Sequence, residues 1–447
     1  MTEVIDVTRL PYVLLLLSVG VTSSPLVPTG SSARPLSLYF AALSVLAFMM
    51  AGRRLRHTRT VLAVVAFLAF LLLRQLFALE YPDPAVAFTF KGQTVQQDLV
   101  SAALTVVVFG LHYFAFQTAF QVLGARRALW YALVGLSLSA ALAVVQGVAD
   151  ILGFGQPINA LTSVFSASAI DWVGRARGLA FEPSWLASQL TVLMVPILLF
   201  LLVAVRRSYG VFTLGRVRMP IEVALLGLAV LALLFTNSRG GLAALVGALG
   251  GLFLYFLRHI HYRMNLLRIL LTIFLVGTVG YVSSGNAYVA SALGSVSKLG
   301  NLQVAFSSAN AGPRFAAWQG AVTTFLEHPW TGVGLGLQHR YFAAHPPQWA
   351  LNQPEVQVWL SPLYADRANA KNLPLRLLSE AGVIGLTLFM VLFMTTWRHR
   401  DGRLLLLFMA VPLGIDFMSL DSLALITYPL ILVLLLEVKR ESQRHHH

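Results

Sequence analysis

Residues 185–205 read WLASQLTVLMVPILLFLLVAV, a stretch without a charged side chain, and Arg206 and Arg207 follow at once. A helix of about 20 apolar residues is long enough to cross a bilayer core of about 30 Å. Similar stretches recur along the chain, which is 57% hydrophobic and 11% charged, whereas soluble domains carry about 25% charged residues. The sequence therefore predicts an all-α polytopic membrane protein.

Twelve apolar stretches are candidates for transmembrane helices. They lie near 11–27, 36–52, 60–79, 98–122, 128–152, 185–205, 219–236, 240–257, 266–283, 373–396, 403–418 and 420–437. We expect helices one to nine within 1–283, a large outer segment at 284–372, and helices ten to twelve within 373–440. Glu3 and Asp6 precede the first stretch, which argues against a cleaved signal peptide. The closing 445–447 is a run of histidines that looks like a tag remnant.

Arginine and lysine residues gather after every second one of these stretches. They follow the second, fourth, sixth, eighth, tenth and twelfth, at 53–59, 126–127, 206–218, 258–268, 398–403 and 439–444. Connections rich in Lys and Arg face the cytoplasm. We therefore expect both termini in the cytoplasm and the 284–372 segment outside. The net charge of +14 then reflects topology, and no nucleic-acid partner is expected.

The outer segment at 284–372 is far longer than an ordinary loop and so is a functional candidate. Phe315, Trp318, Val322 and Phe325 recur at helical spacing and predict an amphipathic helix. A glycine-rich turn follows at 332–336. It resembles a dinucleotide fingerprint only superficially, because no strand-turn-helix context surrounds it.

Twelve basic residues lie away from the predicted inner face. They are Arg34, Arg74, Lys91, Arg175, Arg177, Arg239, Lys298, Arg314, Arg340, Arg367, Lys371 and Arg376. An arginine in a membrane costs on the order of 3 kcal/mol even on the lenient insertion scale, so these residues are candidates for function. Guanidinium groups that converge at the outer face suit a pyrophosphate. The alternative is that some extend to the interface or pair with carboxylates.

Two local motifs stand at predicted outer helix entrances. In the first, Arg175 and Arg177 precede Glu182, which is followed by a proline that can start a helix. Glu182 is a candidate general base beside two arginines, and the alternative role is a helix N-cap. In the second, Ser238, Arg239 and Gly240 form a short turn that holds Arg239 at the rim of a cavity. The alternative is an ordinary tight turn whose arginine only extends to the membrane interface.

A further motif opens the stretch at 373–396. Lys371 and Asn372 form its entrance, and Glu380 lies deeper, where it needs a partner. A structural ion pair with Arg376, one turn earlier, is the expected arrangement. No metal site or cofactor is expected, because the chain lacks cysteine and shows no His-x-x-x-His pair. Among the outer histidines, His339, which is followed by Arg340, is the candidate to test.

These motifs together resemble the O-antigen ligase and O-antigen polymerase superfamily over about 160–390. The residues that carry the resemblance are Arg175, Gly178, Glu182-Pro183-Ser184, Ser238-Arg239-Gly240, Arg314, Trp318, His328-Pro329, Gly332, Gly334 and Gly336. The resemblance implies a GT-C-like membrane glycosyltransferase that needs no metal, in a bacterial inner membrane with its active site facing the periplasm.

One departure separates the two branches of that superfamily. Ligases carry a functional histidine at the position that Lys371 occupies here, and Asn372, Leu375, Glu380 and Gly382 match around it. A lysine stays protonated near pH 7 and binds phosphate better than it removes a proton. This difference and the Glu-Pro-Ser turn favour a polymerase, although His339 is a possible replacement for the missing histidine.

The resemblance implies that the substrates are glycans linked to undecaprenyl pyrophosphate. Under this interpretation Arg175, Arg177, Arg239, Arg314, Arg340 and Lys371 bind the pyrophosphates, with Asn372 beside them, and Trp318 stacks on a sugar. Glu182 is the candidate base, and His339 is the alternative. A chain-length regulator or flippase of the same pathway is an implied partner, together with the bilayer. A ligase that acts on lipid A core or on a protein, and more distantly a lipid-linked oligosaccharide transporter, remain alternatives.

Overall fold

The computed structural model describes residues 7–27, 34–56, 58–81, 83–166, 174–204, 208–214, 217–258, 312–364, 366–396, 400–420 and 422–444. Most of these residues are helical. The strands among them are β1 (Val211–Leu214) and β2 (Val217–Pro220), which pair antiparallel as a hairpin. The predicted helix at 266–283 lies outside the described residues.

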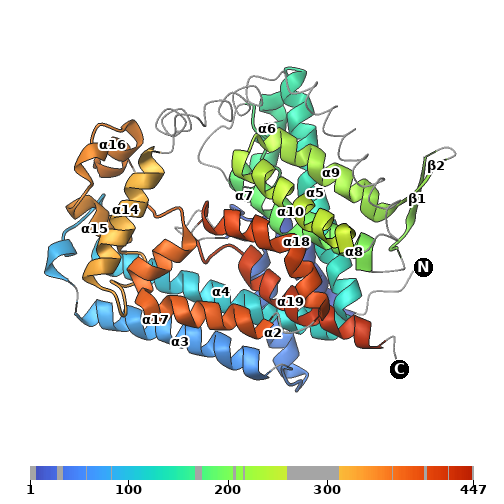
Figure 1. Cartoon of the computed structure of the whole chain (residues 1–447), viewed down its shortest axis with the longest axis horizontal. Helices are drawn as coiled ribbons and strands as arrows, with labels where there is room; N and C mark the ends of the chain where they lie inside the picture. The colour runs from blue at the N-terminus through green and yellow to red at the C-terminus, as the bar shows by residue number, and fades with distance from the viewer. Residues whose placement is uncertain are drawn as a thin grey trace.

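The helices follow one another along the described parts of the chain (Figure 1). Their bounds are α1 Leu10–Leu17, α2 Ser37–Met50, α3 Thr58–Glu80, α4 Val95–Leu123, α5 Ala125–Ile151, α6 Gly155–Ser163, α7 Pro183–Ser188, α8 Val195–Ala204, α9 Ile221–Thr236, α10 Arg239–Arg258, α14 Gly312–Glu327, α15 Gln338–Ala344, α16 Pro354–Leu360, α17 Leu373–Thr396, α18 Arg400–Phe417 and α19 Thr427–Arg444. A π-helix, Gln189–Met194, joins α7 to α8. Short 3-10 turns lie at Val7–Arg9, Ser18–Gly20, Pro84–Val86 and Gln348–Ala350.

Six helical stretches in the described part are long and apolar enough to cross a membrane. They are Arg59–Glu80, Val95–Leu123, Ala125–Ile151, Pro183–Val203, Arg239–Leu257 and Leu373–Thr396. Shorter apolar helices lie at Val7–Gly20, Ser37–Met50, Ile221–Thr236 and Thr427–Glu437. The structure thus agrees with a multi-pass membrane protein, while the number twelve and the GT-C-like fold remain predictions.

Two of the predicted helices are shorter than the sequence indicated. The stretch at 11–27 is helical only to Gly20, because the chain then turns and Ser24 N–H donates to the Arg34 carbonyl at 2.7 Å. The stretch at 420–437 becomes helical only at Thr427. Before it, the Ser422 hydroxyl accepts a hydrogen bond from Ala424 N–H at 3.2 Å, a local turn that competes with helix formation.

The helices α3, α4 and α17 run side by side (Figure 1). The ring of Phe67 on α3 lies 6.2 Å from that of Phe109 on α4 and 5.6 Å from that of Phe389 on α17. The large apolar core continues from these contacts through α1, α5, α9, α10, α18 and α19. The helices α14, α15 and α16 lie beyond one end of this bundle, and the β-hairpin lies at the opposite end (Figure 1).

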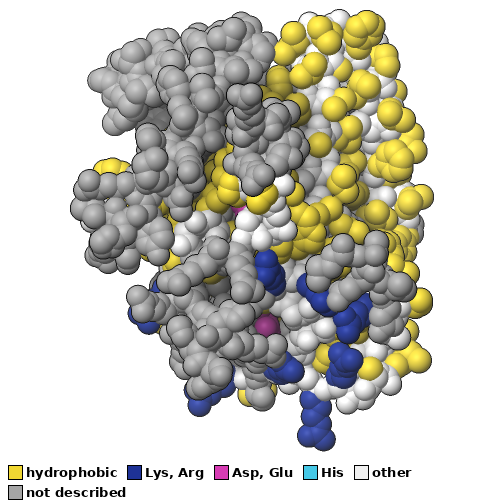
Figure 2. Space-filling view, turned by 90° about the vertical axis from the view of Figure 1, so that its right-hand side faces the viewer, with side chains coloured by type: hydrophobic (Ala, Val, Ile, Leu, Met, Phe, Trp, Pro, Cys, Tyr) yellow, Lys and Arg dark blue, Asp and Glu magenta, His cyan; other side chains and the backbone are white. Residues whose placement is uncertain are grey.

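Basic connections meet at the hairpin end of the bundle. Arg126, after α4, donates to the Ser208 carbonyl at 3.3 Å, and Tyr209 donates to the Arg126 carbonyl at 2.8 Å. Gln117 of α4 donates to the carbonyl of Arg56, after α2, at 2.7 Å. Figure 2 looks onto this side of the molecule and shows Lys and Arg side chains gathered below a hydrophobic surface. The connections after the second, fourth and sixth predicted stretches are thus each in contact with this end of α4 and α5.

Close helix packing in the bundle depends on glycine. A Cβ at Gly135 of α5 would lie 2.4 Å from the Leu17 carbonyl oxygen, and one at Gly20 would lie 2.6 Å from the Gly135 carbonyl oxygen. Small residues of this kind let helix backbones approach one another inside a membrane. By contrast, nothing lies within 4 Å of a Cβ built at Gly250 of α10.

We expect Gly135→Ala to lower the free energy of unfolding by about 1–3 kcal/mol, because the added methyl forces backbone atoms apart. Gly250→Ala is the matched control and should raise it by up to about 1 kcal/mol through better helix propensity. Thermal unfolding of the detergent-solubilised variants measures both effects. Equal stability of the two variants would contradict the close packing of α1 on α5.

Candidate functional site

The helix α17 contains a break near its N-terminal end that organises the candidate site. Gly382 has φ 68° and ψ −171° within Leu373–Thr396, so the predicted continuous helix at 373–396 is interrupted. The turn after α14 supplies the missing hydrogen bonds. Val333 and Gly334 donate to the carbonyls of Ser379 and Glu380 at 3.0 and 2.9 Å, while Val383 and Ile384 donate to the carbonyls of Pro329 and Trp330 at 2.9 and 3.2 Å.

The glycine-rich turn at 332–336 fits into this break because its glycines have no side chains. Gly332, Gly334 and Gly336 all have positive φ, and a Cβ at Gly332 would lie 2.3 Å from the backbone of Glu380. A Cβ at Gly336 would lie 3.1 Å from the Asp98 carbonyl oxygen. The turn is also fixed to α3, because Gln75 donates to the Leu335 carbonyl at 2.9 Å and accepts from Leu335 N–H at 2.7 Å. These contacts place α15 directly against the start of α4.

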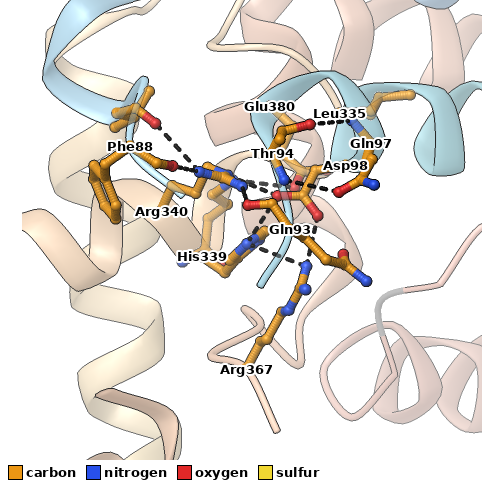
Figure 3. Close-up of polar contacts among 12 residues, drawn as sticks. Phe88, Gln93, Thr94, Gln97, Asp98, Leu335, His339, Arg340, Arg367 and Glu380 are labelled. Atoms are coloured by element: carbon orange, nitrogen blue, oxygen red, sulfur yellow. Dashed lines mark hydrogen bonds and ion pairs between the residues drawn. The ribbon is translucent and has the colours of Figure 1, made fainter. Parts of the chain in front are cut away.

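Asp98, in the first turn of α4, is the centre of the site (Figure 3). Its Oδ2 lies 2.6 Å from Arg340 Nε and 3.4 Å from His339 Nε2, and its Oδ1 lies 2.6 Å from Arg367 Nη1. The Asp98 side chain is only 4% exposed. One buried carboxylate therefore joins α4, α15 and the 366–372 segment.

Arg340 has no exposed side-chain surface and uses its guanidinium within the protein. Besides Asp98, it donates to the Gln93 carbonyl at 2.8 Å and to the carbonyls of Phe88 and Val86. The sequence predicted a pyrophosphate contact for this residue. The structure gives it a structural contact instead, because burial and these acceptors leave the guanidinium no open side.

His339 carries the group best suited to proton transfer. Its ring packs 5.7 Å from that of Phe90, and Nε2 also lies 3.5 Å from Arg367 Nη1. Burial holds the pKa of His339 below the ordinary value for histidine, although the hydrogen bond with Asp98 opposes this effect. The neutral imidazole is therefore the form present near neutral pH. When Nε2 carries the proton and faces Asp98, Nδ1 is left as a basic nitrogen.

The entrance and first turns of α17 carry four further predicted residues. Lys371 Nζ lies 2.9 Å from Glu355 Oε1 and 5.6 Å from the centre of the Trp359 ring. Asn372 caps the helix by accepting a hydrogen bond from Leu375 N–H at 3.0 Å. Glu380 Oε2 lies 2.9 Å from Arg376 Nε, which is the pairing that the sequence suggested, and Glu380 is buried.

A second group of predicted residues lies around α7 and the α9–α10 turn. Arg175 donates to the Thr236 carbonyl at 3.2 Å, and Arg239 is exposed at the start of α10. Glu182 is the residue before the first turn of α7, and its carboxylate accepts a hydrogen bond from Ser184, not from the helix backbone. This group therefore combines a carboxylate with two guanidiniums at neighbouring helix ends.

Arg177 differs from its neighbours in this group because it is buried. It donates to the Ser166 carbonyl and the Ala180 carbonyl, both at 3.0 Å. The chain beside it lies tightly on α5, where a Cβ at Gly178 would come within 2.3 Å of the Ser139 carbonyl oxygen. Arg177 thus fixes the segment that carries Arg175 and Glu182.

Arg314 and Trp318 lie on α14. Arg314 is exposed, and the Trp318 ring packs 5.2 Å from that of Phe315. The indole N–H of Trp318 is buried, and no acceptor for it lies among the described residues.

Sequence reasoning missed Asp98 and gave Arg367 no role. Asp98 begins the predicted stretch at 98–122, and an acidic residue at the outer end of a membrane helix is a usable signal. Arg367 stood among the basic residues away from the inner face. Its pairing with Asp98 depends on a fold that brings together residues 269 positions apart.

We expect Asp98→Ala to lower the free energy of unfolding by about 3–5 kcal/mol, because Arg340 would remain buried without its counter-charge. Asp366→Asn is the control, since Asp366 is exposed next to the same segment and should change stability by less than about 0.5 kcal/mol. Chemical denaturation in detergent measures the difference. Similar values for the two variants would exclude Asp98 as the centre of the outer structure.

Comparison with known proteins bears on this arrangement. Residues 223–390, from α9 into α17, match the family model described as O-antigen ligase. The matched range contains Arg239, Arg314, His339, Lys371 and Glu380, whereas Asp98 and Glu182 lie outside it. A search of the curated proteins found no match. The match, which spans less than half of the chain, supports the resemblance to the O-antigen ligase and polymerase superfamily, whose members are glycosyltransferase-like membrane enzymes.

Proposed function

We propose that this protein transfers a glycan from undecaprenyl pyrophosphate to a sugar hydroxyl on a second lipid-linked repeat unit, as a polymerase. The observation that carries the proposal is the Asp98–His339 pair with Arg367 beside it, at the outer end of a membrane bundle. An orienting carboxylate, a neutral imidazole and a guanidinium are the groups that proton removal and phosphate departure require.

The proposed step needs one base and several cations. His339 takes the proton of the acceptor hydroxyl, the hydroxyl oxygen bonds to the anomeric carbon, and the bond from that carbon to the pyrophosphate oxygen breaks. The lipid pyrophosphate leaves with the electron pair. Asp98 orients His339 and stabilises the imidazolium that forms.

Cations stabilise the charge that develops on the leaving pyrophosphate. Arg367 is 23% exposed, in contrast to the fully buried Arg340, so it has a side from which to reach a phosphate oxygen. Arg175, Arg239, Arg314 and Lys371 remain proposed donors to the same pyrophosphate. With this charge supplied by side chains, the step requires no metal ion, and Trp318 is proposed to stack on a sugar.

Lys371 bears on the choice between polymerase and ligase. It stands where ligases carry their functional histidine, and here its ammonium is paired with Glu355. A paired ammonium is not a base, which supports the polymerase. The ligase remains the second candidate, because the matching family model is described as O-antigen ligase.

The decisive experiment incubates the purified protein with one defined lipid-linked repeat unit in excess chelator. A polymerase should produce a ladder of products that differ by one repeat. A ligase should produce no ladder, and should join preformed polymer to lipid A core or to a protein when that acceptor is added. Loss of all products that is reversed only by adding a metal would contradict the metal-free step.

The identity of the base is tested with matched variants. We expect His339→Gln to lower kcat by about 100-fold or more while donor still binds, because the amide cannot take the proton. His345→Gln, at the exposed end of the same helix, is the control and should retain activity. Normal turnover by His339→Gln together with an inactive Glu182→Gln would instead assign the base to α7.

The pH dependence follows from the same assignment. Because burial lowers the pKa of His339, activity should fall only as the pH drops below the ordinary histidine value of about 6.5. Asp98→Asn removes the charge that favours imidazolium and should move this acidic limb to still lower pH. Plots of kcat/KM against pH for the wild type and Asp98→Asn measure the shift, and identical limbs would contradict the pairing.

A further inference from the structure

The helix α14 has its small residues inside and its large apolar residues outside. Its buried side consists of small residues and one proline: Pro313, Ala316, Ala317, Gly320, Ala321 and Thr324. A Cβ at Gly320 would lie 2.6 Å from the ring of Phe342 on α15, so the partner helix supplies the bulk. The sequence predicted an amphipathic helix here from the spacing of Phe315, Trp318, Val322 and Phe325. None of these four is buried, because the close approach of α15 leaves room only for small residues.

An exposed apolar stripe runs along the outer side of α14 into the turn that follows. Val322 and Leu326, 40% and 70% exposed, stand one helical turn apart on one side of α14, and Trp330, 70% exposed, follows in the turn after the helix. Small residues inside and large ones outside are typical of helices that face lipid, where apolar side chains need no burial in protein.

The stripe continues onto helices that are candidates for spanning the membrane. Beyond Trp330, Arg74 of α3 donates to the Gly332 carbonyl at 2.8 Å, and Ile384 of α17 donates to the Trp330 carbonyl. The neighbouring apolar side chains on these helices are exposed as well: Leu73 65%, Phe77 59%, Val383 39% and Ile384 40%. Both α3 and α17 are long and apolar enough to span a bilayer.

The direction of α14 fits the same surface. It runs across the ends of α3 and α17, which lie parallel to one another (Figure 1). When α3 and α17 stand across a bilayer, α14 lies in the plane of the membrane surface, with polar residues such as Thr323 and Glu327 beside the stripe.

We propose that α14 is an interfacial helix whose stripe of Val322, Leu326 and Trp330 rests in the outer leaflet of the bilayer. Tryptophan prefers the headgroup layer, and amphipathic helices bury an apolar side about 5–10 Å into that boundary. Because α15 packs on α14 and carries His339, the helix also sets the height of the site relative to the lipid. The inference does not depend on the chemistry proposed above.

The absence of cysteine from the sequence makes a direct test possible. Val322→Cys, Leu326→Cys and Trp330→Cys each introduce a single cysteine at an exposed position, where folding is least disturbed. The variants are spin-labelled and reconstituted into phosphatidylethanolamine–phosphatidylglycerol vesicles. Collision of the label with oxygen, which concentrates in lipid, is compared with collision with a water-soluble nickel chelate.

We expect the oxygen-to-nickel collision ratio at the three stripe positions to exceed severalfold that at two controls. The controls are Glu327→Cys, on the polar side of the same helix end, and Gln348→Cys, at an exposed position in the outer region. High nickel access at the stripe would show that it faces water. Low access of both reagents would show that protein covers it, for example a second copy of the chain. Either result would overturn the proposal.

Discussion

The arrangement of α15 and of the segment before α17 against α4 depends on one buried carboxylate. Asp98 stands at the start of a membrane helix and meets two guanidiniums and an imidazole, which come from α15 and from the segment before α17. Burial of ions costs several kcal/mol each, and this cost is offset only when every partner is in place. The carbonyls of Phe88 and Gln93 complete the coordination of Arg340. The pairing therefore allows one position of α15 relative to α4.

The break in α17 is the second constraint, and it acts through the backbone. At Gly382 the helix gives up two of its own hydrogen bonds, and both sides of the gap are satisfied by the 329–334 turn. Unpaired backbone groups near lipid cost several kcal/mol, so the turn and the break stabilise each other. Glycine is required at both positions, because a Cβ at Gly332 would meet the backbone of Glu380 and one at Gly382 would meet the backbone of Trp330. The glycine-rich turn thus attaches α14 and α15 to α17 of the helix bundle.

These two constraints bring the proposed catalytic residues close to the helix that we propose rests in the bilayer. His339 follows directly from the glycine turn, and the same turn leads back to α14 and its exposed apolar stripe. The proposed substrate, with a sugar in water, a pyrophosphate at the headgroups and a polyprenyl tail in the hydrocarbon, would fit a site at this level. The other group of residues, around Glu182 and Arg239, lies at the neighbouring ends of α7 and α10.

The sequence by itself predicted the membrane class, most of the helices and the superfamily resemblance, because apolar length and glycine motifs are local properties. Helix ends at Gly20 and Thr427, the break at Gly382 and the inward side of α14 were decided by tertiary contacts. The same holds for the site. The sequence singled out His339 and Arg340. The fold alone joins Asp98 to Arg340 and Arg367 across more than 240 positions. It buries the guanidinium of Arg340 and leaves that of Arg367 partly exposed.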